Sequence, residues 1–306
     1  MTAVEAITPR NDGAYVFHYP RKFLWSETSR PPAVWRDMDV YLHVPFCRKI
    51  CTFCTFERRV HSRRGMELFV DALQSEISLA AAHDDFSQAK LRSIYMGGGT
   101  ASLLTNDVIA SFLRGIFDLT GSTGGMECTL ECEPTNKRRS DYEFLREHGV
   151  NRVSVGAQTF DNDTLKKLNR SHNADQTKRT VSEALEAGIP TVHIDLMYGL
   201  PDQTPESWRS DLEQAVALGV HHISAYQLIV FDHELLSREM ARNDSHLPPP
   251  EIIDEMRRMA TSVLASPWLQ PVFADGIWAK RVAMPVRHRQ LVRQRLPRFR
   301  IRSLQP

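Results

Sequence analysis

Three cysteines in the first quarter of the chain have types and spacing that suit iron–sulfur chemistry. Cys47, Cys51 and Cys54 are separated by three and then two residues, and they follow a short apolar run directly. Thiolates are the usual ligands of iron–sulfur clusters, and a [4Fe–4S] cube has four irons, so three thiolates leave one iron open. An open iron can bind and reduce a small ligand. The spacing therefore predicts a catalytic [4Fe–4S] cluster and not a purely electron-carrying one.

Two other interpretations of the cysteines stay open at this point: a structural zinc site completed by His43, and buried thiols without a metal. Structural zinc sites combine a close ligand pair with a second pair farther along, and no matching Cys or His pair follows. Cys128 and Cys132 lie on one face of an expected strand and are predicted to be core thiols. This distribution does not suggest a disulfide framework, and it fits a reducing cytoplasm.

The composition is that of an ordinary globular protein. The chain has 306 residues, 42% hydrophobic and 25% charged, with a formal net charge of +1. It can form one barrel-type domain with appendages or two ordinary domains. Neither nucleic acid nor a membrane is an expected partner, because the charge is balanced and no apolar run approaches about 18 residues. The N-terminus has no secretion signal, so a cytoplasmic location is expected.

Short apolar or β-branched runs alternate with stretches of helical periodicity, as in parallel sheets built from βαβ units. The expected strands are Val40–Phe46, Leu91–Met96, Cys128–Glu133, Arg152–Gln158, Thr191–Tyr198 and His222–Val230. The expected helices are Met66–Ala82, Asn106–Leu119, Ser140–His148, Ala174–Ala187 and Pro205–Leu218, with Gly149 and Gly188 as stop signals. Trp208 is predicted to be a core residue, and His221 and His222 to be turn residues before the last strand.

Polar or glycine-rich residues follow nearly every expected strand. They are Cys47, Gly97–Thr100, Glu131 with Glu133, Gln158, Asp195 and Gln227. Catalytic residues of β/α barrels sit at the C-terminal ends of strands, so the pattern favours an α/β fold, a partial (β/α)6 TIM-type barrel, over an open doubly wound sheet. The expected organisation is an N-terminal arm over 1–37, the barrel over 38–265 and an atypical tail over 266–306.

The last 26 residues are strongly basic. Residues 281–306 contain no acidic residue and eight arginines, at positions 281, 287, 289, 293, 295, 298, 300 and 302. A solvated tail is the favoured interpretation, and binding of an anionic partner is the alternative.

Several motifs resemble one enzyme family in its own order, between about residues 38 and 240. They are Tyr41-Leu-His43-Val-Pro-Phe-Cys47, the cysteine triad with Phe53 inside it, Gly97-Gly-Gly-Thr100, Gly149-Val-Asn-Arg-Val-Ser-Val-Gly-Ala-Gln158, Asp195-Leu-Met-Tyr-Gly-Leu-Pro201 and Ile223-Ser-Ala-Tyr-Gln227. This pattern is similar to the oxygen-independent coproporphyrinogen III oxidase-like branch of the radical S-adenosylmethionine (SAM) enzymes, which includes haem-chaperone-like proteins and class C radical SAM methyltransferases.

The resemblance implies a barrel in which the open iron of a [4Fe–4S] cluster binds the amino and carboxylate groups of SAM. One electron, from a donor such as flavodoxin or ferredoxin, cleaves SAM to a 5′-deoxyadenosyl radical that abstracts hydrogen from an organic substrate. The cluster ligands would be Cys47, Cys51 and Cys54. The positions that match SAM contacts are Tyr41, Phe53, Gly98, Gly99, Thr100, Glu131, Gln158, Arg170 and Asp195.

The chain departs from the oxidases of this family in two places. Phe56 stands where they carry a fourth cysteine, so methyl transfer, with one or two SAM molecules, ranks level with porphyrinogen decarboxylation. The expected substrate is a porphyrinogen or a specialised metabolite. The arginine-rich ending matches no family segment, and truncation or an altered reading frame is the expectation there. A haem-delivery protein without turnover and an inactive relative remain as alternatives.

Overall fold

The computed structural model describes residues 37–82, 86, 89–134, 137–230, 235–264, 269–273 and 277–280. The expected arm, apart from Asp37, and the arginine-rich segment 281–306 lie outside these residues. The strands are β1 (Asp37–Val44), β2 (Phe46–Cys47), β3 (Arg59–Val60), β4 (Lys90–Gly98), β5 (Glu127–Cys132), β6 (Arg152–Gln158), β7 (Thr191–Tyr198), β8 (His222–Gln227), β9 (Leu269–Phe273) and β10 (Ile277–Lys280). The helices are α1 (Arg63–Ala81), α2 (Asn106–Thr120), α3 (Arg139–Glu147), α4 (Asn162–Lys167), α5 (Ala174–Glu186), α6 (Pro205–Ala217), α7 (Leu235–Asn243) and α8 (Pro250–Leu264), with a 3-10 turn at Ala101–Leu103.

One eight-stranded sheet organises the fold, in the order β1-β4-β5-β6-β7-β8-β10-β9. The first six of these strands are parallel neighbours, as expected from the alternating sequence pattern. β10 then pairs antiparallel with both β8 and β9. Thus, within the stretch that the sequence assigned to a tail, the chain extends the sheet by two strands.

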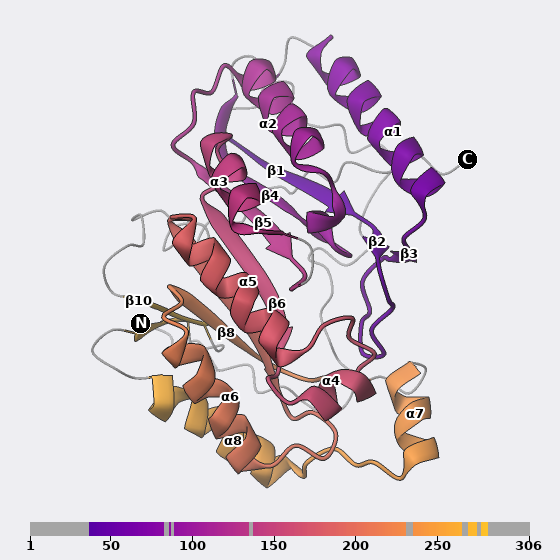
Figure 1. Ribbon diagram of the computed structural model, residues 1–306, viewed down its shortest axis with the longest axis vertical. Coiled ribbons are helices and arrows are strands. Elements are labelled where there is room, and N and C mark those ends of the chain that lie inside the picture. The colour runs from indigo at the N-terminus through magenta and orange to yellow at the C-terminus, as the bar shows by residue number, and fades with distance from the viewer. Residues whose placement is uncertain are drawn as a thin grey trace, which may run out of the picture. The chain divides into compact units, whose positions relative to one another are not determined.

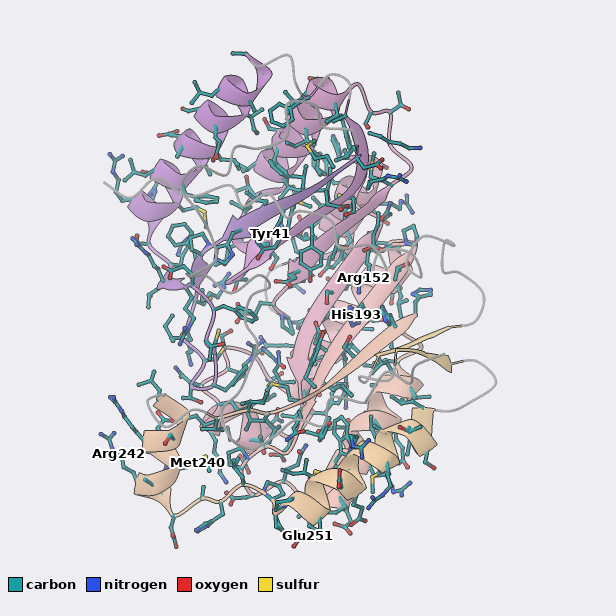
Figure 2. The ribbon with its side chains drawn as sticks, turned by 180° about the vertical axis from the view of Figure 1, so that it is seen from behind. Tyr41, Arg152, His193, Met240, Arg242 and Glu251 are labelled. Atoms are coloured by element: carbon teal, nitrogen blue, oxygen red, sulfur yellow. The ribbon has the colours of Figure 1, made fainter. Side chains whose placement is uncertain are left out.

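The two faces of the sheet differ in character. Helices α2, α3, α5 and α6 lie along one face (Figure 1), where Val40, Leu42 and Val44 of β1 join the main core. Figure 2, seen from behind, shows Tyr41, Arg152 and His193 on the opposite face. Since side chains alternate along a strand, odd-numbered positions of β1 point away from the helices. This arrangement is the partial (β/α)6 barrel that the sequence predicts, with a polar inner face.

Local signals explain where the central helices begin and end. Asn173 caps α5 and forms a capping box with Gln176, and Thr204 caps α6, whose first residue is Pro205. Gly188, just past α5, has a φ of +73°, a left-handed conformation that ends a helix at little cost in glycine. The expected boundaries of these two helices agree with the structure to within one residue.

Three helices were not predicted. α4 has only six residues, too few to show a helical period. α8 is stabilised by tertiary packing against α6, where Trp208 donates a hydrogen bond from Nε1 to the Met256 carbonyl at 2.9 Å. The apolar residues of α8 recur at helical spacing, with Met256, Ala260 and Leu264 buried, so this helix could have been predicted from the sequence. α7 buries only Leu236 fully and gives a weaker signal. Within the described residues, no helix is long and apolar enough to cross a bilayer.

Core predictions for individual residues are largely confirmed. Trp208, Cys128 and Cys132 are buried, and all five cysteines are free. The assignment of His222 to a turn is wrong, because this residue begins β8 and is buried on the inner face. Its ring takes part in a buried polar network, which is described below.

Candidate functional site

The three cysteines lie at the end of β1, on a loop between two short parallel strands. Cys47 ends β2, and the loop continues through Cys51 and Cys54 to β3. All three thiols are half-buried. Among the described residues no group of three His, Cys, Asp and Glu side chains is close enough to hold a single metal ion. A [4Fe–4S] cube binds each thiolate to a different iron, so its ligands stand farther apart than those of one ion.

His43 is engaged in hydrogen bonds, and this argues against the zinc alternative. Its Nε2 donates to the Glu57 carbonyl at 2.9 Å, and its Nδ1 accepts from the Tyr41 hydroxyl at 3.0 Å. Both ring nitrogens are therefore occupied, and the Nε2 bond holds the segment before β3 close to β1. Tyr41, a predicted SAM contact, lies on the inner face with its ring 6.0 Å from that of Tyr95.

Segments from far along the chain hold the cysteine loop in place. The Thr52 N–H donates to the Leu168 carbonyl at 3.2 Å, and its carbonyl accepts from the Leu236 N–H at 3.1 Å. Asn169 Nδ2 donates to the Ile50 carbonyl at 2.8 Å. Phe53, another predicted SAM contact, packs against a small apolar cluster of Leu168, Met197, Leu200, Leu228 and Leu236. The loop is thus fixed by tertiary contacts, since its own sequence forms little regular structure.

The glycine turn after β4 lies directly against this loop. A Cβ atom on Gly99 would lie 2.8 Å from Cys47 Sγ and 2.8 Å from the Phe46 carbonyl oxygen, closer than real Cβ atoms approach. Gly98 has a φ of +112°, which strongly favours glycine, and it lies against the His43 ring. Thr100 forms a side-chain hydrogen bond to the Cys47 thiol. The turn therefore brings backbone, without side chains, next to the first cysteine.

Burial shapes the ionisation of the cysteines. Burial, together with the negative charges of Cys51, Cys54 and Glu133, raises the pKa of Cys47 to about 11, against the lowering effect of the Thr100 hydrogen bond. Burial also raises the pKa of Cys54. Thiolates in this environment need a nearby positive charge, which an iron centre would supply. The donor set thus fits a cationic cluster.

Two carboxylates lie on the inner face, Glu131 near the end of β5 and Asp195 in the middle of β7. Glu131 of β5 accepts from the Tyr95 hydroxyl at 2.6 Å and from the Gly98 N–H at 3.1 Å. Asp195 of β7 accepts from the Ser154 hydroxyl at 2.7 Å. Burial is the largest influence on both groups and raises the pKa of each. Each carboxylate keeps lone pairs for a further donor, such as an amine or a ribose hydroxyl.

Arg170 and Gln158 complete the set of predicted site residues. The Arg170 guanidinium donates from Nη1 to Cys51 Sγ at 3.2 Å and from Nη2 to the Gly156 carbonyl at 2.7 Å, so it is not the surface-loop residue that its sequence context allows. Gln158 has a φ of +70° at a register shift between β6 and β7. A positive φ in a non-glycine residue at a strand end is typical of functional sites.

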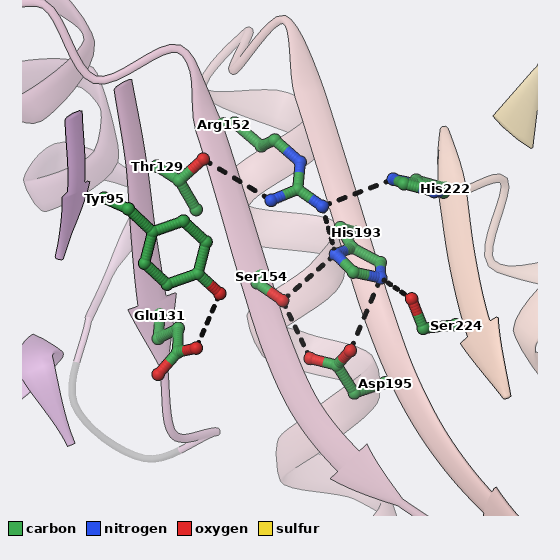
Figure 3. Close-up of polar contacts among 9 residues, drawn as sticks. All are labelled: Tyr95, Thr129, Glu131, Arg152, Ser154, His193, Asp195, His222 and Ser224. Carbon is green, nitrogen blue, oxygen red and sulfur yellow. Dashed lines mark hydrogen bonds and ion pairs between the residues drawn. The ribbon is translucent and has the colours of Figure 1, made fainter. Parts of the chain in front are cut away.

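The structure also shows a buried polar network on the inner face that the sequence analysis missed (Figure 3). Arg152 donates to Nδ1 of His193 at 2.5 Å and to Nδ1 of His222 at 3.3 Å, and the two imidazole rings stack at 4.4 Å. His193 Nε2 lies 2.7 Å from the Ser224 hydroxyl and 3.4 Å from Asp195 Oδ1. The network therefore buttresses Asp195 from two sides, because Ser154 also contacts it.

A signal for this network was present in the sequence. Polar residues occupy every second position at the start of three successive strands: Arg152 and Ser154, His193 and Asp195, and His222 and Ser224. Side chains two apart on a strand share a face, and parallel strands in register place such pairs side by side. Reading the three strands together would have predicted a polar inner face.

Comparisons with known proteins agree with this geometry. The model of the radical SAM superfamily matches residues 41–215, which contain all the predicted site residues. The chain belongs to the radical SAM superfamily. It is 32% identical to the haem chaperone HemW of Lactococcus lactis over 227 residues, 74% of this chain and 58% of that protein. Against HemW of Bacillus subtilis the identity is also 32%, over 73% of this chain and 59% of that protein.

A solved structure supports the fold. Coproporphyrinogen III oxidase (HemN) from Escherichia coli superposes with a TM-score of 0.77 over 88% of this chain and 63% of that chain, at 24% identity. The predicted resemblance to the coproporphyrinogen oxidase-like branch, haem-chaperone-like members included, is confirmed, and the expected cofactors are those of the family. The chain spans little more than half the length of the curated relatives that it matches. The match covers 58% and 59% of the two HemW proteins above and 51% of two further HemW proteins.

Proposed function

We propose that this protein binds a [4Fe–4S] cluster through Cys47, Cys51 and Cys54 and reductively cleaves SAM. The observation that supports this most strongly is the convergence on the cysteine loop of three distant segments: the glycine turn, the end of β5, and Arg170. When bound, the reduced cluster and SAM supply a 5′-deoxyadenosyl radical, which abstracts a hydrogen atom from an organic substrate. The inner face of the barrel is the proposed place for that substrate.

The residues of the chain have distinct roles in this proposal. Gly98, Gly99 and Thr100 let backbone approach the methionine end of SAM, and Arg170 interacts with its carboxylate. Glu131 supports the turn and accepts from the amino group, whereas Asp195 accepts from ribose hydroxyls. Tyr41, Phe53 and Gln158 line the same site. The buttressing of Asp195 by Ser154 and His193 keeps its oxygens oriented without a rearrangement when SAM binds.

The proposed substrate is an organic molecule, a porphyrinogen for oxidative decarboxylation or a specialised metabolite for methyl transfer, with a small protein such as flavodoxin or ferredoxin as the electron donor. Phe56, at the place of the oxidases' fourth cysteine, is 68% exposed and is not part of the packed loop. The replacement of that cysteine by Phe56 places a specialised reaction level with the oxidase reaction. It also leaves an aromatic side chain beside the cluster loop.

The test is anaerobic reconstitution of the protein with iron and sulfide, followed by reduction with dithionite in the presence of SAM. We expect the cluster to give broad absorbance in the visible range. We also expect the reduced protein to form 5′-deoxyadenosine or methylthioadenosine from SAM. A protein that holds the cluster and yields neither product contradicts the enzymatic proposal. Cys54→Ala is the matched variant, which should lose the cluster and the products together.

A second candidate function is haem binding or delivery without turnover. It is favoured by the relatives named haem chaperone, which match over 73% to 74% of this chain. Haem titration at stoichiometric protein should then shift the Soret band and saturate at a fixed ratio. A flat titration would remove this candidate, and an inactive relative would fail both this test and the SAM cleavage test.

A further inference from the structure

The cysteine loop and the segment that follows it carry a strong local positive charge. Residues 48–64 contain six basic residues and one acidic residue, whereas the whole chain has a formal net charge of only +1. Most of the basic side chains are exposed, namely Arg48, Lys49, Arg59, Arg63 and Arg64. Lys49 and Arg59 form no ion pair with any of the described residues, so their charges are available to a partner.

Exposed apolar side chains lie in the same short part of the chain. The exposed fractions of Phe56, Val60 and Leu68 are 68%, 62% and 50%. Figure 1 shows β2, β3 and the start of α1 close together beyond the end of β1. Soluble proteins ordinarily expose such side chains singly, and apolar side chains gathered among polar ones mark interaction sites. Arginine and aromatic side chains are also enriched in protein–protein interfaces.

Hydrogen bonds hold this surface in a defined shape. Arg58 Nη1 donates to the Phe56 carbonyl at 2.8 Å, and His43 Nε2 donates to the Glu57 carbonyl at 2.9 Å. The His61 N–H donates to the Cys47 carbonyl at 2.8 Å. A surface that is already ordered loses little conformational entropy when a partner binds.

The same surface adjoins the predicted cluster ligands. Lys49 lies between Cys47 and Cys51 in the sequence, and Phe56 follows Cys54 by two residues. Burial raises the pKa of Cys54, and the positive charge of Arg58 is near enough to oppose this rise. A protein docked on these residues would therefore sit next to the thiols that hold the cluster.

The proposed reaction needs one electron from a protein donor, and this surface has the properties that such a donor would recognise. We propose that residues 48–64 are the docking surface of an acidic electron-transfer protein. Lys49 and Arg59 attract it by charge, and Phe56 makes an apolar contact with it. The donor is oxidised by one electron and the cluster is reduced by one. Redox partners bind through small interfaces and are steered by charge. The inference rests on the proposed function and deepens it.

The experiment follows electron transfer and binding separately from turnover. Anaerobically reconstituted protein is mixed with a reduced, strongly acidic flavodoxin, and flavin and cluster absorbance give the second-order rate constant at several salt concentrations. Lys49→Glu combined with Arg59→Glu should lower this constant about tenfold at low salt, and the difference should shrink as salt screens the charges. Phe56→Ser should weaken the binding of oxidised flavodoxin, measured by interferometry, by about threefold to tenfold.

The matched control carries the same change of charge elsewhere. Arg179→Glu combined with Arg258→Glu, at exposed positions of α5 and α8, should leave the rate nearly unchanged. Iron content is recorded for every variant. Should the variant at Lys49 and Arg59 lose iron, Arg63→Gln combined with Arg64→Gln on α1 replaces it, and the same salt-dependent loss of rate is required.

A small neutral reductant, photoreduced 5-deazariboflavin, separates the possible failures because it needs no docking surface. It should reduce the cluster of the wild type and of every variant at the same rate. If the wild type accepts this electron and does not cleave SAM, the proposed function fails. The docking inference is overturned if flavodoxin does not reduce the wild type, or reduces it and the variant at Lys49 and Arg59 equally. It is also overturned if that variant slows reduction by deazariboflavin as much as reduction by flavodoxin.

Discussion

Arg170 shows at the scale of a single residue how this site combines structural and chemical tasks. Its guanidinium ties the cysteine loop to the carbonyl of Gly156 in β6 and donates to the Cys51 sulfur. A positive charge at this sulfur lowers the cost of a thiolate in a half-buried place. The same side chain keeps one buried N–H for a ligand. Replacing it would therefore disturb the loop, the thiolate and the ligand together.

The cluster ligands themselves give the most direct prediction at this scale. Cys51→Ala should abolish the visible absorbance and most of the bound iron after anaerobic reconstitution, because two thiolates cannot hold the cube. Iron analysis and absorbance spectra check this. Cys128→Ala is the matched control, since Cys128 is buried in the core away from the loop and should leave iron content unchanged. Retained iron in Cys51→Ala would refute the ligand assignment.

At the scale of elements, two features determine what can approach the thiols. One is the turn between β4 and the 3-10 helix, and the other is the set of parallel strand ends. The turn contacts Glu131, His43 and Cys47 in succession through its three glycines. β6 ends in a register shift next to β7, which re-aims Gln158. These irregularities occur at strand ends, where a regular hydrogen-bond ladder no longer constrains the backbone.

Gly99→Ala tests the close approach at the turn. Gly99 does not have a positive φ, so the added methyl group acts mainly through its clash with the Cys47 sulfur and the Phe46 carbonyl. We expect a folded protein that retains iron about tenfold less well against a chelator, because the Cys47 sulfur must move to relieve the clash. Gly115→Ala on α2 is the matched control, because Gly115 also lacks a positive φ and its new methyl group would lie 2.9 Å from the Ile77 side chain and not from a thiol, so this variant should keep its iron. Equal retention in the two variants would count against the role of the turn.

A buried carboxylate in the middle of α6 holds this helix against the segment that follows β6, and this predicts a pH dependence. Asp211 accepts from the Thr159 hydroxyl at 2.8 Å and the Phe160 N–H at 2.7 Å, while burial raises its pKa to about 6. A folded-state pKa above the unfolded value makes the group stabilising below about pH 4, and this contribution is lost as the pH rises through about 6.

Relative to wild type, Asp211→Asn should therefore gain stability as the pH increases from 4 to 7, by at most about 3 kcal/mol. Urea unfolding of the iron-free protein, followed by circular dichroism at several pH values, measures the difference. Effects of other groups cancel in this comparison. Asp118→Asn, at an exposed position of α2, is the control. A difference that is constant across this range would contradict the prediction.

At the scale of the whole molecule, the cysteine loop joins parts of the sequence that are far apart. Asn169 and Ile50 are 119 positions apart, and Leu236 donates to Thr52 from the start of α7. The small apolar cluster around Phe53 connects the same loop to the ends of β7 and β8. Loss of the metal should therefore weaken these contacts of the cysteine loop before it weakens the hydrogen bonds of the sheet.

Hydrogen exchange can detect this order of destabilisation, the cysteine loop before the sheet. Removing iron from the reconstituted protein should accelerate exchange at the amides of Thr52 and Leu236, whose bonds hold the loop, while the amides of β6 and β7 stay protected by the sheet. Mass spectrometry of the two forms checks this at peptide level. The iron-free Cys51→Ala variant should match the chelated protein. A uniform increase across the sheet would contradict the prediction.

The sequence predicted the regular part of the fold and the site residues nearest the motifs. The six parallel strands follow from alternating apolar runs, and the glycine turn and cysteine loop from spacing. It missed α8, which depends on packing against Trp208, and β9 and β10, which depend on pairing with β8. It also missed the contacts of Arg152 and those of Glu133 with Ser102 and Ser171. The partners of Glu133, β9 and β10 come from other strands and loops, which no local pattern indicates. The helical spacing of α8 and the alternating polar residues around Arg152 were signals that could have been read.

The docking of the cysteine loop has a consequence for how the protein is made. Ribosomes add about 5 to 20 residues per second, so the chain between Cys51 and Leu236 takes roughly 10 to 40 seconds to synthesise. During that interval the three thiols have left the ribosome, but the segments that enclose them do not yet exist. Exposed thiols are oxidised most readily in such a state. We therefore expect a stable cluster only after Leu236 has been synthesised, since the contacts that hold the loop are complete only then.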